Sequence, residues 1–305
     1  MLKCSPYGSG STYVIDDPGN LLTFLYNGDD INMAKGKTGK IYVPGVLLSI
    51  SEPIVTLLDT PTFTISAIAE NGLPASDYEI EIRRMGDNEP WYKWYEGSSK
   101  TFTPTARAAG FYEVRASALL NGTRVYSAKK DFDVYFPKVE NFMYEADLQP
   151  TFNAMWTTTE TETTTTQRRE HGCYITLNTT NGMYGTIAHA SGPWMENDEL
   201  AGMILPAQNL NLPFTPSPTG MAVYVVGWFH THTPTTYVTF AERSVGPSDK
   251  DKEHASTNSL PGIVYDYLED PSIPGKIPAG HPLGMGKKLY PITPPERRLK
   301  PWNMD

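Results

Sequence analysis

Four runs of alternating apolar and polar residues between positions 46 and 137 predict β-strands. Apolar side chains recur at every second position in residues 63–67, 78–82, 112–116 and 132–136. A period of two turns one face of a strand toward a core and the other toward water, as in antiparallel sheets. The turn dipeptides Asn-Gly at 71–72 and 121–122 separate some of these runs. About seven short strands in roughly 90 residues predict a β-sandwich over residues 46–137.

A different pattern in the second half ends at two histidines. The apolar run 225–229 leads directly into His230, Thr231 and His232. Alternate side chains of a strand face the same side, so the two histidines point the same way, with Cα atoms roughly 6.5–7 Å apart. Two imidazoles placed in this way can bind one metal ion. The alternative is that two polar residues simply end a buried strand.

A helix start is predicted a short distance downstream. Ser248 follows Pro247 and can cap a helix whose first turn carries Asp249 and Asp251, where acidic residues are favoured. The apolar residues 262–265 then predict another strand. The order strand, loop, helix, strand would lean Asp251 toward the two histidines. His254, one helical turn later, is expected to be an exposed helix histidine, with a contact near the site as the alternative.

The remaining segments divide the chain further. Residues 1–45 are polar and Gly-rich, which favours an extension or a fragment of a preceding domain, with short strands at 22–26 and 40–43. Residues 138–169 form a Thr-rich connector, predicted to be a flexible linker or an edge strand. Residues 170–305 form the second domain, with a tail from 277 onward that is expected to lack regular structure. The fold class predicted is a β-rich, two-domain chain: a sandwich followed by an α+β domain with a mixed sheet flanked by helices.

The composition of the chain argues against several classes of function. The chain has 305 residues, which favours two domains, and its net charge of −9 argues against a nucleic-acid partner. No run of about 18 apolar residues occurs, so membrane insertion is not expected. The N-terminus lacks the apolar core of a secretion signal, which leaves the localisation open between the cytoplasm and export within a larger system. Two cysteines, Cys4 and Cys173, are too few for a disulfide framework or a thiolate zinc site.

The histidine pair and the helix start together resemble a known motif. His230-x-His232 followed by Ser248-x-x-Asp251 looks like the JAB/MPN (JAMM) family of zinc metallopeptidases, and Gly-Trp-Phe at 227–229 is similar to the residues often found before that motif. The resemblance implies that His230, His232 and Asp251 bind Zn²⁺ and that Ser248 contacts the oxyanion. Two features depart from the family: its proline after the second histidine stands one place later here, and the segment 233–247 is longer.

The family also has a glutamate on an earlier strand, and three residues are candidates for this general base. Glu170 opens the strand-like run 170–177, which with residues 181–188 resembles a hairpin of bacterial JAB-like domains of surface and toxin-associated proteins. Glu196 and Glu199 lie in the segment 194–200, which is predicted to be a short helix with solvated carboxylates. Glu170 is therefore favoured, and its neighbour His171 is expected to face the other way.

A second resemblance concerns the sandwich. Residues 109–116, followed by the turn at 121–122 and the run 132–137, resemble the last two strands of immunoglobulin-like modules in bacterial surface proteins. This resemblance implies a spacer or a binding role, since such sandwiches carry sites of many kinds.

The function expected from both resemblances is a zinc-dependent hydrolase of amide bonds, a peptidase or isopeptidase acting on a protein or peptide. Zinc would activate a water and Glu170 would accept its proton. The alternatives are a non-enzymatic surface, assembly or adhesion module with a JAB-like fold, and the effector end of a polymorphic toxin within a larger assembly.

Overall fold

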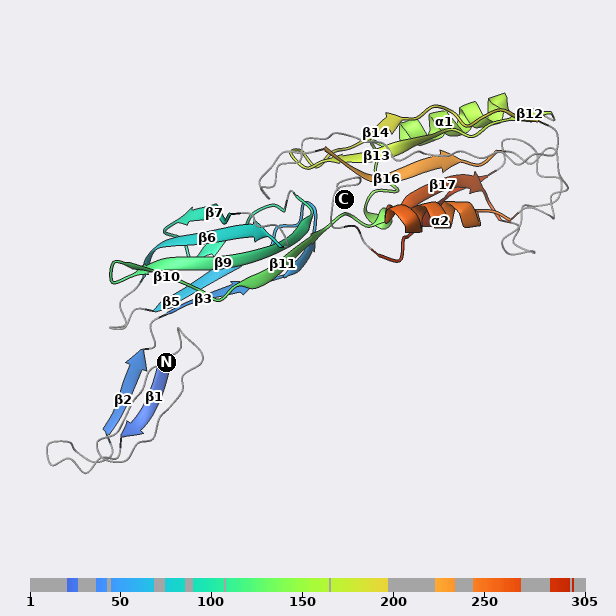
Figure 1. Ribbon diagram of the computed structural model, residues 1–305. Helices are drawn as coiled ribbons and strands as arrows, with labels where there is room; N and C mark the ends of the chain where they lie inside the picture. Colours follow the sequence, from blue (N-terminus) through green and yellow to red (C-terminus); the bar gives the residue numbers. More distant parts are fainter. Residues whose placement is uncertain are drawn as a thin grey trace. The chain divides into compact units, whose positions relative to one another are not determined.

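The computed structural model divides the chain into two compact units, shown in Figure 1. The first comprises Met1–Val55, Asp59–Ala106 and Phe111–Asp133, and the second Thr56–Leu58, Arg107–Gly110 and Val134–Asp305. The structure describes residues 21–26, 37–42, 45–68, 75–85, 90–106, 108–164, 166–196, 223–233, 244–269, 286–296 and 298. In these ranges no helix is long and apolar enough to cross a membrane.

Two sheets make the first unit a β-sandwich. The smaller sheet has the order β3-β5-β8 and the larger one β4-β11-β9-β6-β7, with β10 paired to β9. A separate antiparallel pair joins β1 and β2. The strand bounds are β1 Leu21–Tyr26, β2 Lys37–Tyr42, β3 Gly45–Ile50, β4 Ile54–Thr56, β5 Phe63–Ile68, β6 Ser76–Arg84, β7 Tyr92–Gly97, β8 Thr101–Phe102, β9 Gly110–Leu120, β10 Thr123–Tyr126 and β11 Lys130–Tyr135.

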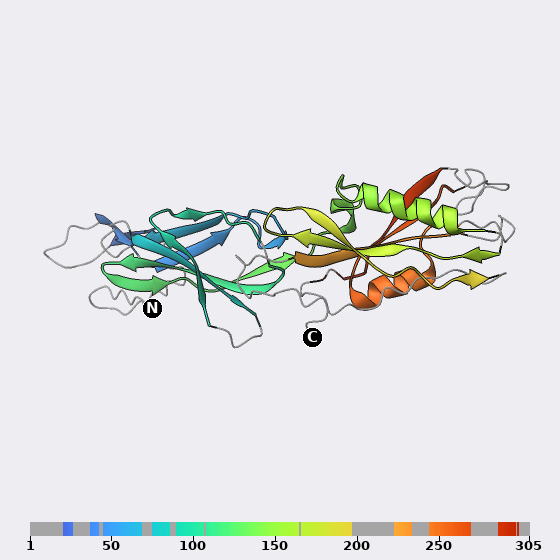
Figure 2. The same ribbon diagram turned by 90° about the horizontal axis from the view of Figure 1, so that it is seen from above.

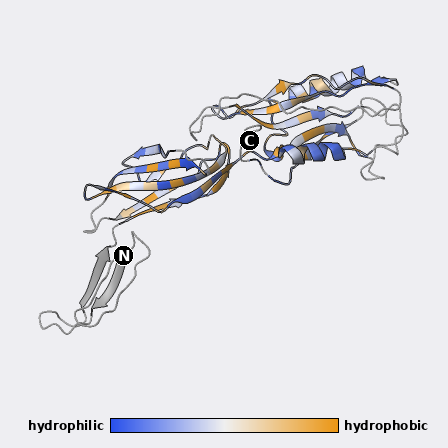
Figure 3. Ribbon diagram, viewed as in Figure 1, coloured by the Kyte–Doolittle hydropathy of each residue, from blue (hydrophilic) through white to orange (hydrophobic). Residues whose placement is uncertain are grey.

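The core of the sandwich follows the period-two pattern of the sequence. The apolar positions of the predicted runs are buried, and Phe63, Ile80, Tyr112 and Phe132 have no exposed surface. Figure 3 shows hydrophilic and hydrophobic residues alternating along these strands. The rings of Phe63 and Phe132 meet edge to face, with 5.3 Å between their centroids, which is a favourable aromatic geometry. The strands predicted in this part of the chain are therefore confirmed.

The second unit is built on a mixed five-stranded sheet with the order β14-β13-β16-β17-β18. β16 runs parallel to β17, and the other neighbours are antiparallel. A short antiparallel pair joins β12 and β15. The bounds are η1 Val139–Asn141, α1 Gln149–Glu162, β12 Gln167–Arg168, β13 Gly172–Asn178, β14 Tyr184–Ala188, β15 Met195–Glu196, β16 Val223–Thr231, α2 Asp249–Asn258, β17 Gly262–Tyr267 and β18 Lys287–Ile292.

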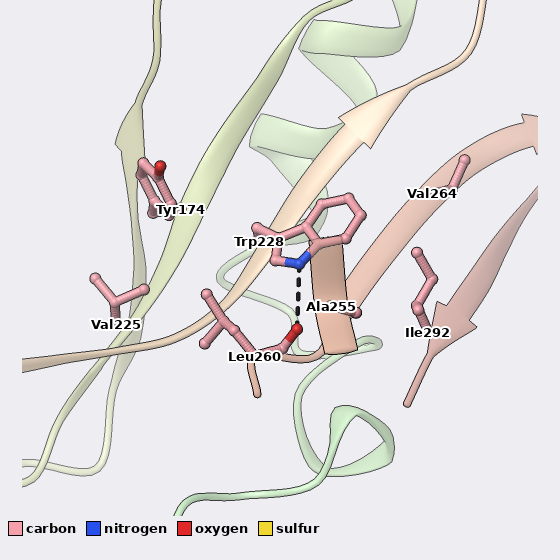
Figure 4. Packing of buried hydrophobic residues seen from close by; sticks show 7 residues of the cluster. All are labelled: Tyr174, Val225, Trp228, Ala255, Leu260, Val264 and Ile292. Atoms are coloured by element: carbon pink, nitrogen blue, oxygen red, sulfur yellow. Dashed lines mark hydrogen bonds between the residues drawn. The ribbon is translucent and has the colours of Figure 1, made fainter. Parts of the chain in front are cut away.

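The helices α1 and α2 cover opposite faces of this sheet, as Figure 2 shows. On one face, Phe152 of α1 stacks on Phe229 of β16 with 4.0 Å between the ring centroids. On the other, Ala255 of α2 is buried in a cluster with Trp228, whose indole Nε1 donates to the Leu260 carbonyl at 3.2 Å (Figure 4). Trp228 and Phe229 are adjacent in one strand, so their side chains point to opposite faces.

Three expectations about local structure are wrong, and the first concerns the Thr-rich connector. Residues 149–162 form α1 rather than a linker or an edge strand. Phe152, Trp156 and Thr159 share the buried face of the helix at spacings of four and three residues. The hydroxyl groups of Thr158 and Thr161 donate to carbonyls four residues earlier, at 3.0 Å each. Packing of this apolar face outweighs the preference of threonine for strands.

The other two corrections concern short segments that form strands. Residues 195–196 pair with β12 as β15, so the predicted helix at 194–200 does not form there, and Glu199 lies outside the described residues. Residues 287–292 of the expected irregular tail form β18, which pairs with β17. Leu289 and Ile292 are buried, so this edge strand is held by its apolar face.

Candidate metal centre

His230 and His232 lie at the end of β16 on the face that α2 covers. Both side chains are buried, and their ring centroids are 5.1 Å apart. Thr231 between them turns to the other face, where its hydroxyl lies 2.5 Å from that of Thr159 in α1. The alternation expected of a strand therefore places both imidazoles on one side.

Asp251 comes from the first turn of α2, which begins as the sequence predicts. Ser248 is the N-cap, and its Oγ accepts a hydrogen bond from the Asp251 backbone N–H at 3.2 Å. The Asp251 carboxylate accepts in return from the Ser248 N–H at 2.7 Å, which completes a capping box. The Ser248 hydroxyl also donates to Asp251 Oδ2 at 2.7 Å. These contacts hold the carboxylate in one direction.

The three side chains converge on one point. Asp251 Oδ1 lies 3.4 Å from His230 Nε2, and Asp251 Oδ2 lies 3.4 Å from His232 Nε2. Ligand atoms of the three residues all fall within 4.8 Å of one another. Two atoms each about 2.0–2.1 Å from a tetrahedral zinc ion are separated by about 3.4 Å. The distance from the Asp251 carboxylate to each histidine matches this separation.

One nitrogen of the cluster is unpaired. Within the part of the chain that the structure describes, His230 Nε2 is buried and has no hydrogen-bond partner. Buried nitrogen and oxygen atoms are nearly always paired, so an orphan among potential ligands points to a missing partner. Two nitrogens and a carboxylate are also a donor set that zinc accepts in catalytic sites.

A further carboxylate, Asp266 of β17, orients His232. His232 Nδ1 lies 2.9 Å from Asp266 Oδ2, which also accepts from the Gly246 N–H at 2.9 Å. Asp266 has no exposed surface. Because Nδ1 donates to this carboxylate, Nε2 of the same ring is directed toward Asp251. This is the outer-shell arrangement common to metal-binding histidines.

Sequence reasoning missed Asp266 as a site residue. The signal that could have found it is an acidic residue directly after the apolar run 262–265, inside a strand whose six residues are all buried. An ionised side chain in such a strand needs a partner.

The two histidines differ in charge. Burial lowers the pKa of His230 to about 4, although the charge of Asp251 opposes this, so the ring is neutral at pH 7. Burial also acts to lower the pKa of His232, but Asp266 and Asp251 outweigh it and raise the pKa to about 10. The pKa of Asp251 is lowered, because the hydrogen bond and charges of the histidines outweigh its desolvation. The His232 ring is thus protonated at pH 7, and a metal ion bound at its Nε2 would displace that proton.

The other sequence candidates occupy different positions. Glu170 is buried just before β13, and its charge is among those that raise the pKa of His232. Glu196 is exposed in β15. Ser248 contacts Asp251 as its cap, and the segment 234–243 that separates it from the histidines lies outside the described residues.

His254 is less exposed than the sequence suggested. Its ring meets the edge of Trp228 with 5.2 Å between centroids, and burial lowers its pKa. His230 contacts the same indole, also at 5.2 Å. The two histidines therefore share one aromatic neighbour beside the cluster.

Comparisons with known proteins found similarity to solved structures, of which two follow. No protein-family model and no curated protein matches the chain. The solution structure of a fibronectin type III domain from human KIAA0970 protein has 17% identity and a TM-score of 0.25, and the match covers 30% of this chain and 73% of that one. The crystal structure of domains A168–A170 from titin has 14% identity and a TM-score of 0.25, with 32% and 36% covered. At these values neither match bears on function, and the β-sandwich rests on the sheets of the first unit.

Proposed function

We propose that the second unit is a zinc-dependent hydrolase of amide bonds of the JAB/MPN type, a peptidase or isopeptidase acting on a protein or peptide. The observation that supports this is the convergence of His230, His232 and Asp251 on one buried point, where His230 Nε2 has no hydrogen-bond partner among the described residues. The mixed sheet with a helix on each face is consistent with the same family.

Each residue has a role that follows from its place. A zinc ion bound by His230, His232 and Asp251 would lower the pKa of a bound water from 15.7 toward about 7. Glu170, a buried carboxylate whose charge acts on His232, would accept a proton from the attacking water and return it to the leaving amine. Asp266 keeps the His232 ring in the orientation that presents Nε2.

The role of Ser248 as an oxyanion contact requires one rearrangement. Its hydroxyl donates to Asp251 Oδ2 in the free protein. A substrate oxyanion would have to take over that hydrogen bond, after which the Ser248 backbone N–H would be the one contact of the capping box still made to the carboxylate. A single preorganised donor of this kind contributes roughly 2.7–4 kcal/mol to transition-state stabilisation.

Metal analysis tests the binding part of this proposal. We expect the purified, zinc-loaded chain to retain about one zinc ion per molecule after dialysis, as four-coordinate protein sites do. The His230→Ala and Asp251→Ala variants should lose it. His189→Ala is the matched control, because His189 is outside the cluster and its Nδ1 lies 2.8 Å from the Ala190 carbonyl oxygen. A wild-type chain that binds no zinc, or a His230→Ala variant that binds it unchanged, would overturn the proposal.

Activity of a base variant tests the catalytic part. The Glu170→Gln variant should keep its zinc and hydrolyse a mixed peptide library about 10²–10⁴ times more slowly than wild type, because it lacks the proton acceptor. The exposed Glu196→Gln change should have no effect. Equal rates in wild type and Glu170→Gln would exclude Glu170 as the base. If the wild-type chain binds zinc but hydrolyses no peptide of the library, the result would favour a non-enzymatic module.

A further inference from the structure

A second cluster of reactive side chains lies on the other side of the second unit's sheet. Thr231, which faces α1, accepts a hydrogen bond from the His171 backbone N–H at 3.1 Å. The His171 side chain contacts Glu162, the last residue of α1. The metal cluster, by contrast, faces α2. The two groups of residues are thus separated by the sheet, although Glu170 and His171 are neighbours in the chain.

Three side chains form a continuous hydrogen-bonded relay in this cluster. His171 Nε2 lies 2.8 Å from Glu162 Oε2, and His171 Nδ1 lies 3.0 Å from Ser191 Oγ. A carboxylate only accepts hydrogen bonds, so Nε2 must carry the proton. In the neutral ring the Nδ1 lone pair then accepts from the Ser191 hydroxyl. A nucleophile, a base and a carboxylate that sets the tautomer of the base are the parts of an activated serine.

Arg169 keeps the carboxylate in place. Its Nε and Nη2 donate to the two oxygens of Glu162 at 2.5 and 2.6 Å, a bidentate pair. The hydrogen bond from Arg169, helped by that from His171, lowers the pKa of Glu162 to about 2. Glu162 is therefore ionised at neutral pH and stabilises the imidazolium that forms when His171 takes up a proton.

An exposed aromatic ring adjoins the relay. The Arg169 guanidinium lies 4.4 Å from the centroid of the Trp194 ring, and 46% of Trp194 is exposed. Ser191 is only partly buried and stands three residues before this tryptophan. A flat apolar surface beside an accessible hydroxyl suits a substrate with an aromatic or aliphatic group next to its reacting carbonyl.

We propose that Ser191, His171 and Glu162 form a second, metal-independent site that accepts acyl groups from esters or thioesters of apolar character. Ser191 Oγ attacks the acyl carbonyl, and its proton passes to His171 Nδ1. The bond from the carbonyl carbon to the leaving oxygen or sulfur breaks, the leaving group departs with the electron pair, and the His171 imidazolium gives its proton to the leaving group or to solvent. An acyl-serine remains beside a neutral His171. A water then attacks the acyl carbonyl and gives its proton to His171 Nδ1, and the carboxylic acid leaves as that proton returns to Ser191 Oγ.

The test uses p-nitrophenyl acetate with the full chain. We expect a burst of about one equivalent of p-nitrophenolate and an acetyl group on Ser191, located by peptide mass spectrometry, because acyl-enzyme accumulation gives this signature. Ser191→Ala should abolish both. Ser127→Ala is the matched control, since Ser127 Oγ donates only to a backbone carbonyl. Acetylation elsewhere at an unchanged rate in Ser191→Ala would overturn the proposal.

Two further variants separate a reactive site from a merely structural network. His171→Gln should slow acetylation of Ser191 by about 10²–10⁴-fold through loss of the base. Glu162→Gln should slow it by roughly 10-fold or more while Ser191 stays in place. Rates unchanged in His171→Gln would show that Ser191 is not activated by its neighbour.

The acetylation test of Ser191 can be judged separately from the proposal of a zinc site. Acetylation of Ser191 should persist after chelation and in the His230→Ala variant, because neither change touches the α1 face. Loss of acetylation in both would show that the two sites are one, against the proposal. A failure of zinc binding alone would leave the serine site standing.

Discussion

The two units treat buried charge in opposite ways. In the sandwich, the buried carboxylate Glu79 is met by Lys93 at 2.9 Å and Arg124 at 3.2 Å, both of which reach it from more exposed positions. In the second unit, His230, His232 and Asp251 are buried together, and His230 Nε2 has no hydrogen-bond partner in the ranges that the structure describes.

This difference distinguishes buried polar groups that stabilise the fold from those proposed to bind a ligand. A buried polar atom without a hydrogen bond costs about 1–3 kcal/mol, so a fold that contains one is less stable than it needs to be. The compensated carboxylate of the sandwich indicates a structural role. In the second unit, the proposed metal ion would supply the partner that His230 Nε2 lacks among the described residues.

A core substitution in the sandwich should give the largest effect while leaving the site intact. Phe63 is fully buried and contacts the rings of Trp94 and Phe132. Phe63→Ala should lower the free energy of unfolding of this unit by about 3–5 kcal/mol. Urea unfolding measures this, with the 40% exposed Phe111→Ala as control. Zinc content should not change, and its loss in Phe63→Ala would show that the site depends on the sandwich.

Zinc should stabilise only the second unit. At a free concentration about 100 times its dissociation constant, a ligand adds about 2.7 kcal/mol to the free energy of unfolding of the state that binds it. Hydrogen exchange, followed peptide by peptide, should slow in β13 and β16 and stay unchanged in β6 and β9. Equal slowing in both units would contradict a local site.

Removing the charge of Asp266 should weaken metal binding without removing a ligand. Asp266→Asn replaces the carboxylate that accepts from His232 Nδ1, and loss of such outer-shell partners costs about 10–100-fold in affinity. Titration with a zinc-binding dye measures this. Glu79→Gln is the matched control, because it removes a buried carboxylate of the other unit. An unchanged affinity in Asp266→Asn would show that the residue does not support the site.

The smallest effect concerns pH and the carboxylate at the end of α1. The pKa of Glu162 is about 2 in the folded chain against an ordinary value of 4.5, because Arg169 and His171 bond its ionised form. Its contribution is therefore present above pH 4.5 and is lost as the pH falls toward 2. The side chain is partly exposed, so we expect about 1 kcal/mol. The stability difference between wild type and Glu162→Gln, measured without metal, should be smaller at pH 2.5 than at pH 6. A difference that grows at low pH would contradict this.

Short-range patterns in the sequence determined the elements that depend on near neighbours. The period-two runs predicted β5, β6, β9 and β11, because alternation along a strand follows from backbone geometry alone. The same geometry placed His230 and His232 on one face. The capping box between Ser248 and Asp251 joins residues three positions apart, so the sequence alone predicted where α2 begins. Whether zinc binds there stays a prediction.

Contacts between distant elements were decided only by the tertiary structure. Residues of the expected linker form α1 because Trp156 is buried against the rings of Tyr265 and Tyr267. Asp266 reaches His232 across 34 positions, through the parallel register of β16 and β17. The relay from Ser191 to Glu162 likewise joins three separate segments. A pattern of apolar and polar residues specifies the faces of an element, whereas the register and packing that bring two faces together depend on the whole chain.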